Sequence, residues 1–445
     1  MATAEPGVAV IRTATELAGA RVVPAAAAVF ALAGCPSAET VGDRTTPENP
    51  TWYSRPSGAL HVVAHRPLTA TSRQVGEEYE RGKAEIDPRR SRVFVGSSDH
   101  GLYALRASDG SSLWRFETLG VVQSEPYYDE ELDTVFFGSH DGALYAVRAQ
   151  DGTLVFRFAA GAEVAKRPVR LGETLFFANA SDYLFAIDRR TGKPKWQVHR
   201  TSALGMEVSG HAGPAVDPRS GLVYMAYSDG HVVAYDAKDG AERWTPVDLS
   251  ADAEQATGGE APRYLDVDTT PVLDDHPQGK VVYVAAYGAG VVALDAVTGS
   301  RVWSSEKTVG VTDLMVYRDA AHDPSPHGPD RGGPPVPPYK VLVASSASSG
   351  LWGLDPTTGR VLWRNAVPDG GVTSPTQVAG ALLVGTTRYG LFLLSPRNGR
   401  VIDGVDFGGG FAQTPSAYGN HAYVVTNTGT FLGLVVEPPI ARPRP

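Results

Sequence analysis

Four side chains of one loop have types that can bind a metal, and the rest of the chain offers little catalytic chemistry. The loop 318–340 carries His322, Asp323, His327 and Asp330, but their spacing does not fit a rigid metal site. The sequence has no Gly-x-Ser-x-Gly elbow, no His-Glu-x-x-His pair, no phosphate-binding loop and no dinucleotide fingerprint. We therefore predict no catalytic residue, no metal site and no bound cofactor.

The charge balance narrows the range of partners. The chain has 40 basic and 49 acidic residues, which gives a net charge of −9, and no cluster of Lys and Arg stands out. Nucleic acid is therefore not an expected partner. The chain has 1 cysteine, so it cannot form an internal disulfide.

The sequence before Cys35 predicts export and covalent attachment to a membrane. Arg21 precedes a short apolar run, and 32–34 are Leu-Ala-Gly, which together are typical of a secretory signal. Leu-Ala-Gly-Cys also resembles the bacterial lipobox, which implies cleavage before Cys35 and its acylation by chains such as palmitate. A buried N-terminal helix with an incidental cysteine is the alternative. The predicted segments are a signal peptide, 1–34, a flexible tether, 35–56, and a folded domain, 57–445.

A turn motif with an aromatic residue recurs along the chain and predicts the fold. In the copy at 186–196, Asp188 can bond turn amides, Gly192 can take a positive φ, and Trp196 follows four residues later. Short strands and glycine turns with a period of about 40 residues predict a β-propeller, in which these rings wedge between blades. The predicted blade-docking residues are Trp114, Phe156, Trp196, Trp244, Trp303 and Trp363.

The two ends of the chain decide the number of blades. Complete units run over 83–407, and 410–435 supplies three strands of a further unit. The segment 58–64 is a spare strand, in which Gly58 and Val62 have the spacing of the glycine and tryptophan of the repeat. We therefore predict an all-β fold: an eight-bladed propeller of four-stranded antiparallel blades, whose ring is closed by 58–64 in the C-terminal blade.

Two stretches on neighbouring blades could bind a partner. Asp266 and Asp268 flank Val267, and strand alternation would place both carboxylates on one side of an inner strand. There they could pair with basic residues of a partner, or else with local turn amides. Met206 and Val208 also share a face, and the core of a blade is their alternative position.

The turn motif resembles the tryptophan-docking repeat of quinoprotein dehydrogenases, which hold pyrroloquinoline quinone in an eight-bladed propeller. The resemblance implies a pair of adjacent cysteines, a calcium site and a catalytic aspartate. A chain with 1 cysteine has no such pair. This resemblance therefore favours the fold rather than the cofactor.

A second resemblance is to the BamB-type outer-membrane protein assembly lipoproteins. It rests on the lipobox, the length, the eight units and the stretch Leu-Asp-Val-Asp-Thr-Thr-Pro at 265–271. In that family, these acidic residues and a Leu-x-Leu-Arg motif one blade earlier contact a polypeptide-transport-associated (POTRA) domain of the barrel-assembly insertase. Here Ser209 stands in place of that arginine, which removes a bidentate donor. The partner-binding residues that the resemblance implies are Met206, Val208, Ser209, Asp266 and Asp268.

The prediction is a non-enzymatic, lipid-anchored scaffold of the outer-membrane β-barrel assembly machinery. It would face the periplasm from the outer membrane and dock a POTRA domain of the insertase. Two alternatives belong to other classes: a quinone-dependent dehydrogenase-like enzyme, and an envelope lipoprotein that binds glycan or peptidoglycan. An aromatic-lined groove would favour the second of these.

Overall fold

Strands and turns make up the described part of the chain, and they form one repeated unit. The computed structural model describes residues 39–40, 58–68, 80–201, 212–249, 267–319, 337–366, 371–388, 390–406 and 410–437. These residues belong to one compact unit, Ala38–Pro445. Across these ranges no helix combines the length and the apolar character needed to span a membrane.

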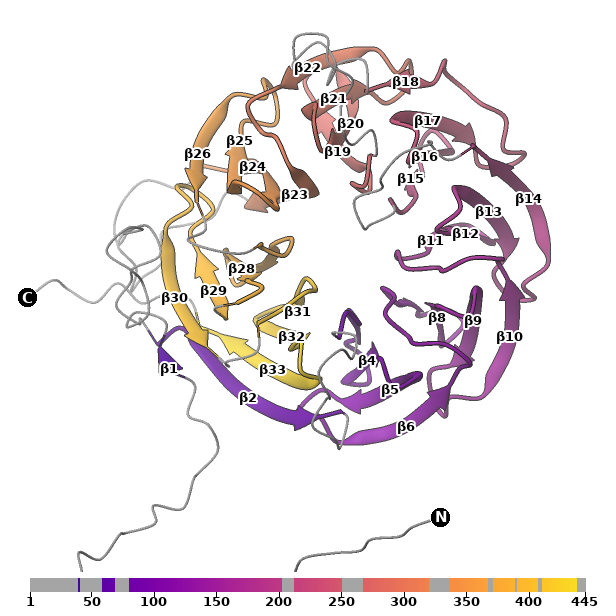
Figure 1. Ribbon diagram of the computed structural model, residues 1–445, viewed down its shortest axis with the longest axis vertical. Coiled ribbons are helices and arrows are strands. Elements are labelled where there is room, and N and C mark those ends of the chain that lie inside the picture. The colour runs from indigo at the N-terminus through magenta and orange to yellow at the C-terminus, as the bar shows by residue number, and fades with distance from the viewer. Residues whose placement is uncertain are drawn as a thin grey trace, which may run out of the picture. The chain divides into compact units, whose positions relative to one another are not determined.

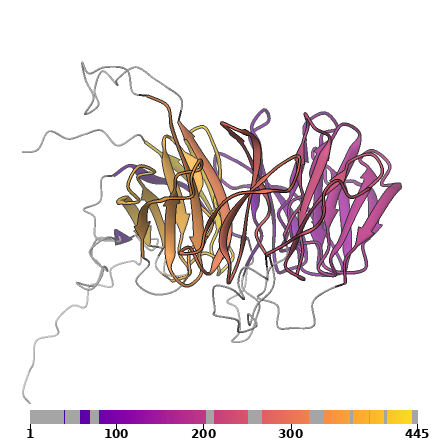
Figure 2. The ribbon, with the colours of Figure 1, turned by 90° about the horizontal axis from the view of Figure 1, so that it is seen from above.

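Eight antiparallel sheets are arranged as blades around a ring, with the first strand of each blade innermost (Figures 1 and 2). The prediction of an all-β, eight-bladed propeller is confirmed. The strands of blades 1 to 4 are β3 (Ala84–Asp87), β4 (Arg92–Gly96), β5 (Gly101–Arg106), β6 (Ser112–Glu117); β7 (Tyr127–Asp129), β8 (Thr134–Ser139), β9 (Ala143–Arg148), β10 (Leu154–Ala159); β11 (Val169–Leu171), β12 (Thr174–Ala178), β13 (Tyr183–Asp188), β14 (Pro194–His199); and β15 (Ala215–Asp217), β16 (Leu222–Ala226), β17 (His231–Asp236), β18 (Val247–Asp248).

The remaining strands complete the ring in chain order. Those of blades 5 to 8 are β19 (Val272–His276), β20 (Gly279–Ala286), β21 (Gly290–Asp295), β22 (Arg301–Ser305); β23 (Val311–Asp319), β24 (Tyr339–Ser346), β25 (Gly350–Leu354), β26 (Val361–Asn365); β27 (Thr376–Val378), β28 (Ala381–Gly385), β29 (Leu391–Leu394), β30 (Val401–Asp406); and β31 (Ser416–Tyr418), β32 (His421–Val425), β33 (Thr430–Val436), β2 (Leu60–Pro67).

The N-terminal strand closes the ring, as predicted. β2 pairs antiparallel with β33, from Leu60 opposite Val436 to Pro67 opposite Thr430, and lies on the outside of blade 8 (Figure 1). Both ends of the chain therefore contribute to one sheet, and β33 is not left as an open edge.

The equivalence of Val62 with the tryptophan position is wrong by two residues. The pairing of β2 skips Val63, so that Ala64 lies opposite Gly433, as Trp303 lies opposite Ala293 in blade 5. Ala64 is buried, whereas Val62 is exposed. Blade 5 has the same β-bulge at Val302, three residues after Gly299, whereas in β2 the bulge at Val63 lies five residues after Gly58, so the spacing argument failed.

The aromatic rings of the repeat pack against the glycine turn of the following blade. A Cβ placed on Gly359 would lie 2.4 Å from the Trp303 ring, so only glycine fits there. The indole N–H of Trp303 donates to the carbonyl of Pro356 in the same turn at 3.1 Å. The same contact with a following glycine is made by Trp114, Phe156, Trp196, Trp244 and Trp363.

Trp244 departs from the regular pattern. It lies before β18 rather than within an outer strand, and the backbone pairing in this part of blade 4 is an isolated bridge between Tyr235 and Glu242. Its ring is buried, but its indole N–H has no partner among the described residues. Tyr224 instead donates its hydroxyl, at 2.9 Å, to the carbonyl of Ala296 in the turn of blade 5.

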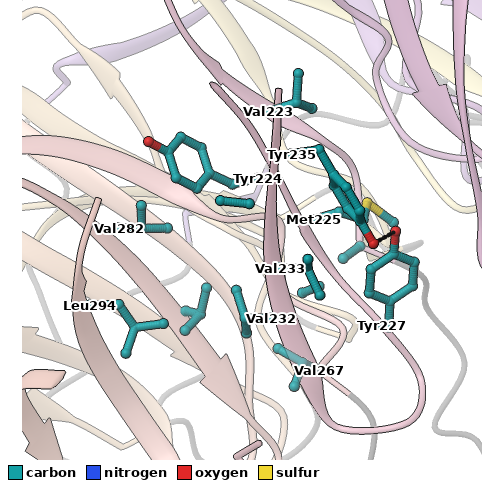
Figure 3. Close-up of a cluster of buried hydrophobic side chains, with 14 of the residues drawn as sticks. Val223, Tyr224, Met225, Tyr227, Val232, Val233, Tyr235, Val267, Val282 and Leu294 are labelled. Atoms are coloured by element: carbon teal, nitrogen blue, oxygen red, sulfur yellow. Dashed lines mark hydrogen bonds between the residues drawn. The ribbon is translucent and has the colours of Figure 1, made fainter. Parts of the chain in front are cut away.

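Apolar side chains between the blades form the core. In the cluster that joins blades 4 and 5, Tyr224 and Val232 from one blade lie on the side of Val282 and Leu294 from the other (Figure 3). Val267 enters the same cluster from the segment before β19. Each blade thus buries its faces against its neighbours, as the repeat requires.

A short strand lies within the predicted tether. β1 (Glu39–Thr40) pairs antiparallel with β30 and extends the sheet of blade 7. The sequence analysis predicted no strand in 35–56, since this segment lacks alternating apolar positions. Backbone pairing at a sheet edge does not require that pattern.

Candidate functional site

The segments that lead into the inner strands gather at one face of the ring. We call this face the linker face; its described segments are 80–83, 121–126, 163–168, 212–214, 267–271, 306–310, 371–375 and 410–415. The linkers into blades 1, 2, 5, 6 and 8 each donate a backbone amide to the preceding blade: the amide of Val267, for example, donates to the carbonyl of Tyr227 at 3.2 Å. These bonds fix the positions of the five segments relative to the preceding blade.

A proline stands directly before six of the inner strands. Since proline has no N–H to donate to a ladder, it is suited to the first position of a strand. The prolines that precede inner strands are Pro126, Pro168, Pro214, Pro271, Pro375 and Pro415.

In three blades a hydroxyl two residues before this proline takes the place of a ladder bond. Thr269 Oγ1 donates to the carbonyl of Ala285 at 2.9 Å and accepts from the amide of the same residue at 2.8 Å. Ser124 accepts from the amide of Gly138 at 3.1 Å, and Thr373 accepts from the amide of Gly385 at 2.9 Å. Thr269 and Pro271 of the stretch 265–271 therefore have a structural role at the start of blade 5.

The residue directly before the proline faces the axis of the ring. A cavity of about 1110 Å³ lies along this axis, and its wall includes Glu125, Arg167, Thr270, Ser374 and Thr414, all from this position. The cavity opens at the linker face, where His140 and Glu163 form an ion pair of 2.8 Å at its rim.

The two sides of the cavity differ in chemistry. Blades 1 to 3 supply charged groups, whereas blades 7 and 8 supply mainly hydroxyl, amide and small side chains. The charged lining residues are Arg81, Lys83, Glu85, Glu125, His140, Glu163, Lys166, Arg167 and, from blade 6, Asp313. The hydroxyl and amide lining of blades 7 and 8 comprises Thr373, Ser374, Thr376, Thr387, Gln413, Thr414 and Ser416.

Ion pairs connect the charged wall across neighbouring blades. Lys83 Nζ lies 2.8 Å from Glu125 Oε2, and Lys166 Nζ lies 3.8 Å from Glu125 Oε1. Burial alone would raise the pKa of Glu125, but Lys83 and Lys166 outweigh it and lower the pKa to about 2. In the same wall, Arg167 pairs with Glu85.

Asp268 is the one predicted partner-binding residue that the structure describes, and it is half-buried at the linker face. The preceding Val267 is buried, so the side chain of Asp268 leaves the core. The prediction that this stretch lies within an inner strand is wrong, because β19 begins only at Val272. The negative charge of Asp268 is one of the causes that raise the pKa of Lys166, so Asp268 lies near the charged wall of the cavity.

The segments that enter blades 3, 4 and 5 meet at this part of the linker face. The amide of Gly213 donates to Thr270 Oγ1 at 2.9 Å. A Cβ on Gly213 would lie 3.0 Å from the Cβ of Lys166. The segments that enter blades 3, 4 and 5 are therefore in direct contact, and 212–214 continues from the stretch that contains Met206.

Several predicted residues lie outside the described part of the chain. They are Cys35, Met206, Val208, Ser209 and Asp266, together with the loop residues His322, Asp323, His327 and Asp330. In the described ranges, no group of three His, Cys, Asp or Glu side chains could hold a metal ion.

The sequence analysis missed the charged wall. It noted the recurrent prolines but not that the residue before each of them lines one cavity. That position, read down the repeat, would have identified Glu125 and Arg167. Lys83, Lys166 and Asp313 stand at other positions, so only the ring brings them to the same wall.

Comparison with known proteins supports one family. A family model described as "Outer membrane protein assembly factor BamB" matches residues 131–322, 319–402 and 347–437. An outer membrane protein assembly factor BamB of Legionella pneumophila is 26% identical over 48% of this chain and 49% of its own length. The corresponding protein of Yersinia pestis is 27% identical over 76% of this chain and 68% of its own length.

An enzyme is also among the relatives. A tetrathionate hydrolase of Acidithiobacillus ferrooxidans is 23% identical over 77% of this chain and 56% of its own length. The chain thus spans about half the length of the first two relatives.

Solved structures show the same fold. The crystal structure of BamB from Moraxella catarrhalis covers 84% of this chain and 99% of its own, with a TM-score of 0.63 and 19% identity. A quinohemoprotein alcohol dehydrogenase from Pseudomonas putida covers 91% of this chain and 81% of its own, with a TM-score of 0.61 and 13% identity. At these identities the likeness extends to the fold alone.

Proposed function

The chain belongs to the family described as outer membrane protein assembly factor BamB, and we propose that it is a non-enzymatic scaffold of outer-membrane β-barrel assembly. In this proposal it docks a POTRA domain of the insertase, and Cys35 carries a lipid anchor that holds it at the periplasmic side of the outer membrane. Its proposed docking residues are Met206, Val208, Ser209, Asp266 and Asp268.

One observation carries the docking proposal: the linkers into blades 3, 4 and 5 meet at the linker face beside Asp268. Gly213 bonds to Thr270, so the described linkers into blades 4 and 5 belong to one surface. Because Val267 is anchored in the core, Asp268 is held at this surface by a buried neighbour. A carboxylate at such a rim contributes to the rate and specificity of docking with a basic partner surface.

The dehydrogenase alternative requires a wall that can hold pyrroloquinoline quinone, a planar molecule with three carboxylates. Three of the four Lys and Arg side chains that line the cavity, Lys83, Lys166 and Arg167, already pair with glutamates of the same wall. The aromatic side chain of the described lining is Tyr418, at the far end from the linker face. These residues do not fit a planar polyanion, and we derive no reaction step through it.

The glycan alternative also finds little support in this wall. Sugar-binding grooves present aromatic faces to their ligands, and the described lining of the cavity offers Tyr418 alone. No second function is therefore proposed.

Charge reversal at Asp268 tests the docking proposal. Purified protein is titrated calorimetrically with the purified periplasmic domain of the insertase. We expect Asp268→Arg to weaken binding at least about tenfold, because a like charge would face the basic partner surface. Asp275→Arg is the matched control: Asp275 is exposed at the far end of β19 in the same blade, and its change should leave the affinity unaltered.

Two results would overturn the proposal. The first is equal affinity of wild type and Asp268→Arg, when circular dichroism shows both to be folded. The second is tight binding of pyrroloquinoline quinone with calcium, accompanied by dye-linked oxidation of an alcohol, which would make the protein an enzyme.

A further inference from the structure

Three neighbouring blades carry an excess of exposed basic side chains. In the described residues of β25, β26 and the blades that follow, Glu437 is the single exposed carboxylate, and it lies 3.8 Å from His61. Asp355 is half-buried, and Asp403 and Asp406 are buried. The exposed basic residues of the same ranges, 350–366, 371–388, 390–406, 410–437 and 58–68, are Arg66, Arg360, Arg364, Arg388, Arg397 and Arg400. This part of the ring thus differs in sign from the whole chain, whose net charge is −9.

The stretches of sequence that join these strands do not cancel the excess. The stretches 39–57, 69–79, 367–370, 407–409 and 438–445 carry 5 basic and 6 acidic residues, so as a group they are close to neutral. The arginines come from separate strands and turns. A cluster of basic residues is therefore absent from the sequence and is formed only by the ring.

Five of these arginines lie on the outside of the ring. Arg66 and Arg364 stand on β2 and β26, the fourth strands of blades 8 and 6 (Figure 1). Arg360 directly precedes β26, and Arg400 directly precedes β30, the fourth strand of blade 7. Arg397 belongs to the same turn as Arg400. We call these five residues the basic rim.

The guanidinium groups of the basic rim are available to a partner. Among the described residues, none of the five has a carboxylate within ion-pair distance. Arg364 lies over the ring of Trp352, 4.6 Å from its centroid, and donates Nε–H to the carbonyl of Ser349 at 3.2 Å. Arg397 lies over the ring of Tyr339 at the same centroid distance of 4.6 Å. The rings restrain these side chains, and their remaining N–H groups suit phosphate oxygens.

The path of the chain brings the proposed lipid anchor to the same blades. β1 begins at Glu39 and pairs with β30 of blade 7. Three residues, 36–38, separate Cys35 from Glu39, and a chain of this length spans at most about 14 Å when fully extended. A lipid on Cys35 would therefore keep the membrane close to blade 7, the middle blade of the basic rim.

We propose that the basic rim rests on the periplasmic surface of the outer membrane, where its arginines meet anionic phospholipid headgroups, with blade 7 nearest to the lipid. This inference rests on the proposed lipid anchor and extends it: the anchor holds the chain at the membrane, and the rim sets the orientation of the ring. Electrostatic attraction of basic residues to anionic lipids adds to the binding by a lipid anchor. A ring that stands on its rim leaves the linker face clear for a docking partner.

Quenching of a fluorescent label by lipids with a nitroxide headgroup measures which blade is near the membrane. The lipidated full chain is reconstituted into vesicles of phosphatidylcholine with phosphatidylglycerol, and into vesicles of phosphatidylcholine alone. Because the chain has 1 cysteine, which the lipid occupies, an introduced cysteine is a unique labelling site. Asn398→Cys labels the turn of blade 7, and Thr191→Cys labels the equivalent position before the turn glycine of blade 3, across the ring. We expect stronger quenching at position 398 than at position 191 in the anionic vesicles.

A charge-matched pair of variants tests the role of the arginines. The rim variant combines Arg66→Gln, Arg397→Gln and Arg400→Gln and should abolish the excess quenching at position 398. The control variant removes three exposed basic side chains from blades 2, 3 and 4 and should retain that excess. Its substitutions are Arg148→Gln, Lys193→Gln and Lys238→Gln.

Three results would overturn the role of the rim. They are equal quenching at both positions, an excess at position 398 that is as large in the neutral vesicles, and an excess that persists in the rim variant. If the rim variant instead converts a dimer into a monomer without vesicles, the rim is an interface between copies of the chain and the proposal also fails.

Mass spectrometry of the purified protein decides the anchor separately. If Cys35 carries no lipid, the anchor of the proposed function fails, and the rim is decided by co-sedimentation of the unlipidated full chain with the anionic vesicles. The rim variant must then bind at least about tenfold more weakly than the control variant, because each basic side chain near an anionic surface contributes about fivefold. Equal binding of the two variants would refute the rim.

Discussion

Single buried carboxylates tie neighbouring blades together. Asp217 ends β15 in blade 4, is 3% exposed, and accepts from Lys280 Nζ of blade 5 at 2.7 Å. It also accepts from the hydroxyl of Ser220 at 2.7 Å. Asp87, Asp129 and Asp274 occupy similar positions near the ends of other inner strands, each with a basic partner.

The stability of the protein should fall in acid because of Asp217. Burial alone would raise the pKa of Asp217, but Lys280, Ser220 and the amide of Arg219 lower it from 3.8 to about 2. The folded state therefore holds a proton less readily than the unfolded state. This contribution, roughly 2 kcal/mol, is complete above about pH 4 and is lost as the pH falls through about 2.

Urea unfolding between pH 7 and pH 2 measures this contribution. Asp217→Asn should be less stable at pH 7 and should lose less stability than the wild type on acidification. Asp275→Asn changes an exposed carboxylate near Arg219 and serves as the control. Parallel curves for the wild type and Asp217→Asn would contradict the assignment.

The turn motif is the element that the sequence predicted best. The distance from glycine to tryptophan is short and local, and both residues act where a glycine turn meets a ring of the preceding blade. The number of blades followed from counting this motif. The position of Ala64 could not be predicted in the same way, because the bulge in β2 lies two residues farther from its glycine than in blade 5, which only the pairing with β33 shows.

In blade 7, Asp403 stands at the position of the aromatic ring. At the junction of blades 7 and 8 no turn joins β33 to the outer strand, since β2 comes from the other end of the chain. The carboxylate of Asp403 instead accepts from the amides of Ala59 at 2.7 Å and Leu60 at 3.0 Å. Asp403 is buried and so holds the strand that closes the ring.

Removal of the Asp403 carboxylate should weaken the attachment of β2, the strand that closes the ring. Asp403→Ala removes the acceptor of three backbone amides, those of Ala59, Leu60 and Gly404, which should cost at least about 2–4 kcal/mol of unfolding free energy. Asp403→Asn keeps one acceptor oxygen and should cost less. Hydrogen exchange at Ala59 and Leu60 reports the effect locally. Unchanged protection of these amides in Asp403→Ala would show that the carboxylate does not hold β2.

Only part of the candidate site could be predicted from the sequence. Asp268 was identified through a resemblance, and its neighbour Val267 is indeed buried in the core. The strand assigned to it was wrong, because the hydroxyl of Thr269 replaces a ladder bond there. The charged wall depends on contacts between blades that are far apart in the chain, and no local spacing encodes such contacts.

At the scale of the whole molecule, the ring serves to bring linkers from many blades to one face. Five of the linkers donate a backbone amide to the preceding blade, so this part of the linker face is held by the blades. Such a surface suits a scaffold that must dock a partner domain in one orientation. The axial cavity at its centre gives that surface a charged mouth.

Site-specific photo-crosslinking in cells tests the scaffold function most directly. A photoreactive amino acid placed at position 268 should form a crosslink to the barrel-assembly insertase. The same group at position 275, at the other end of the inner segment of blade 5, should not. Recovery of no assembly component from position 268, or equal recovery from both positions, would contradict the docking of the insertase at the linker face.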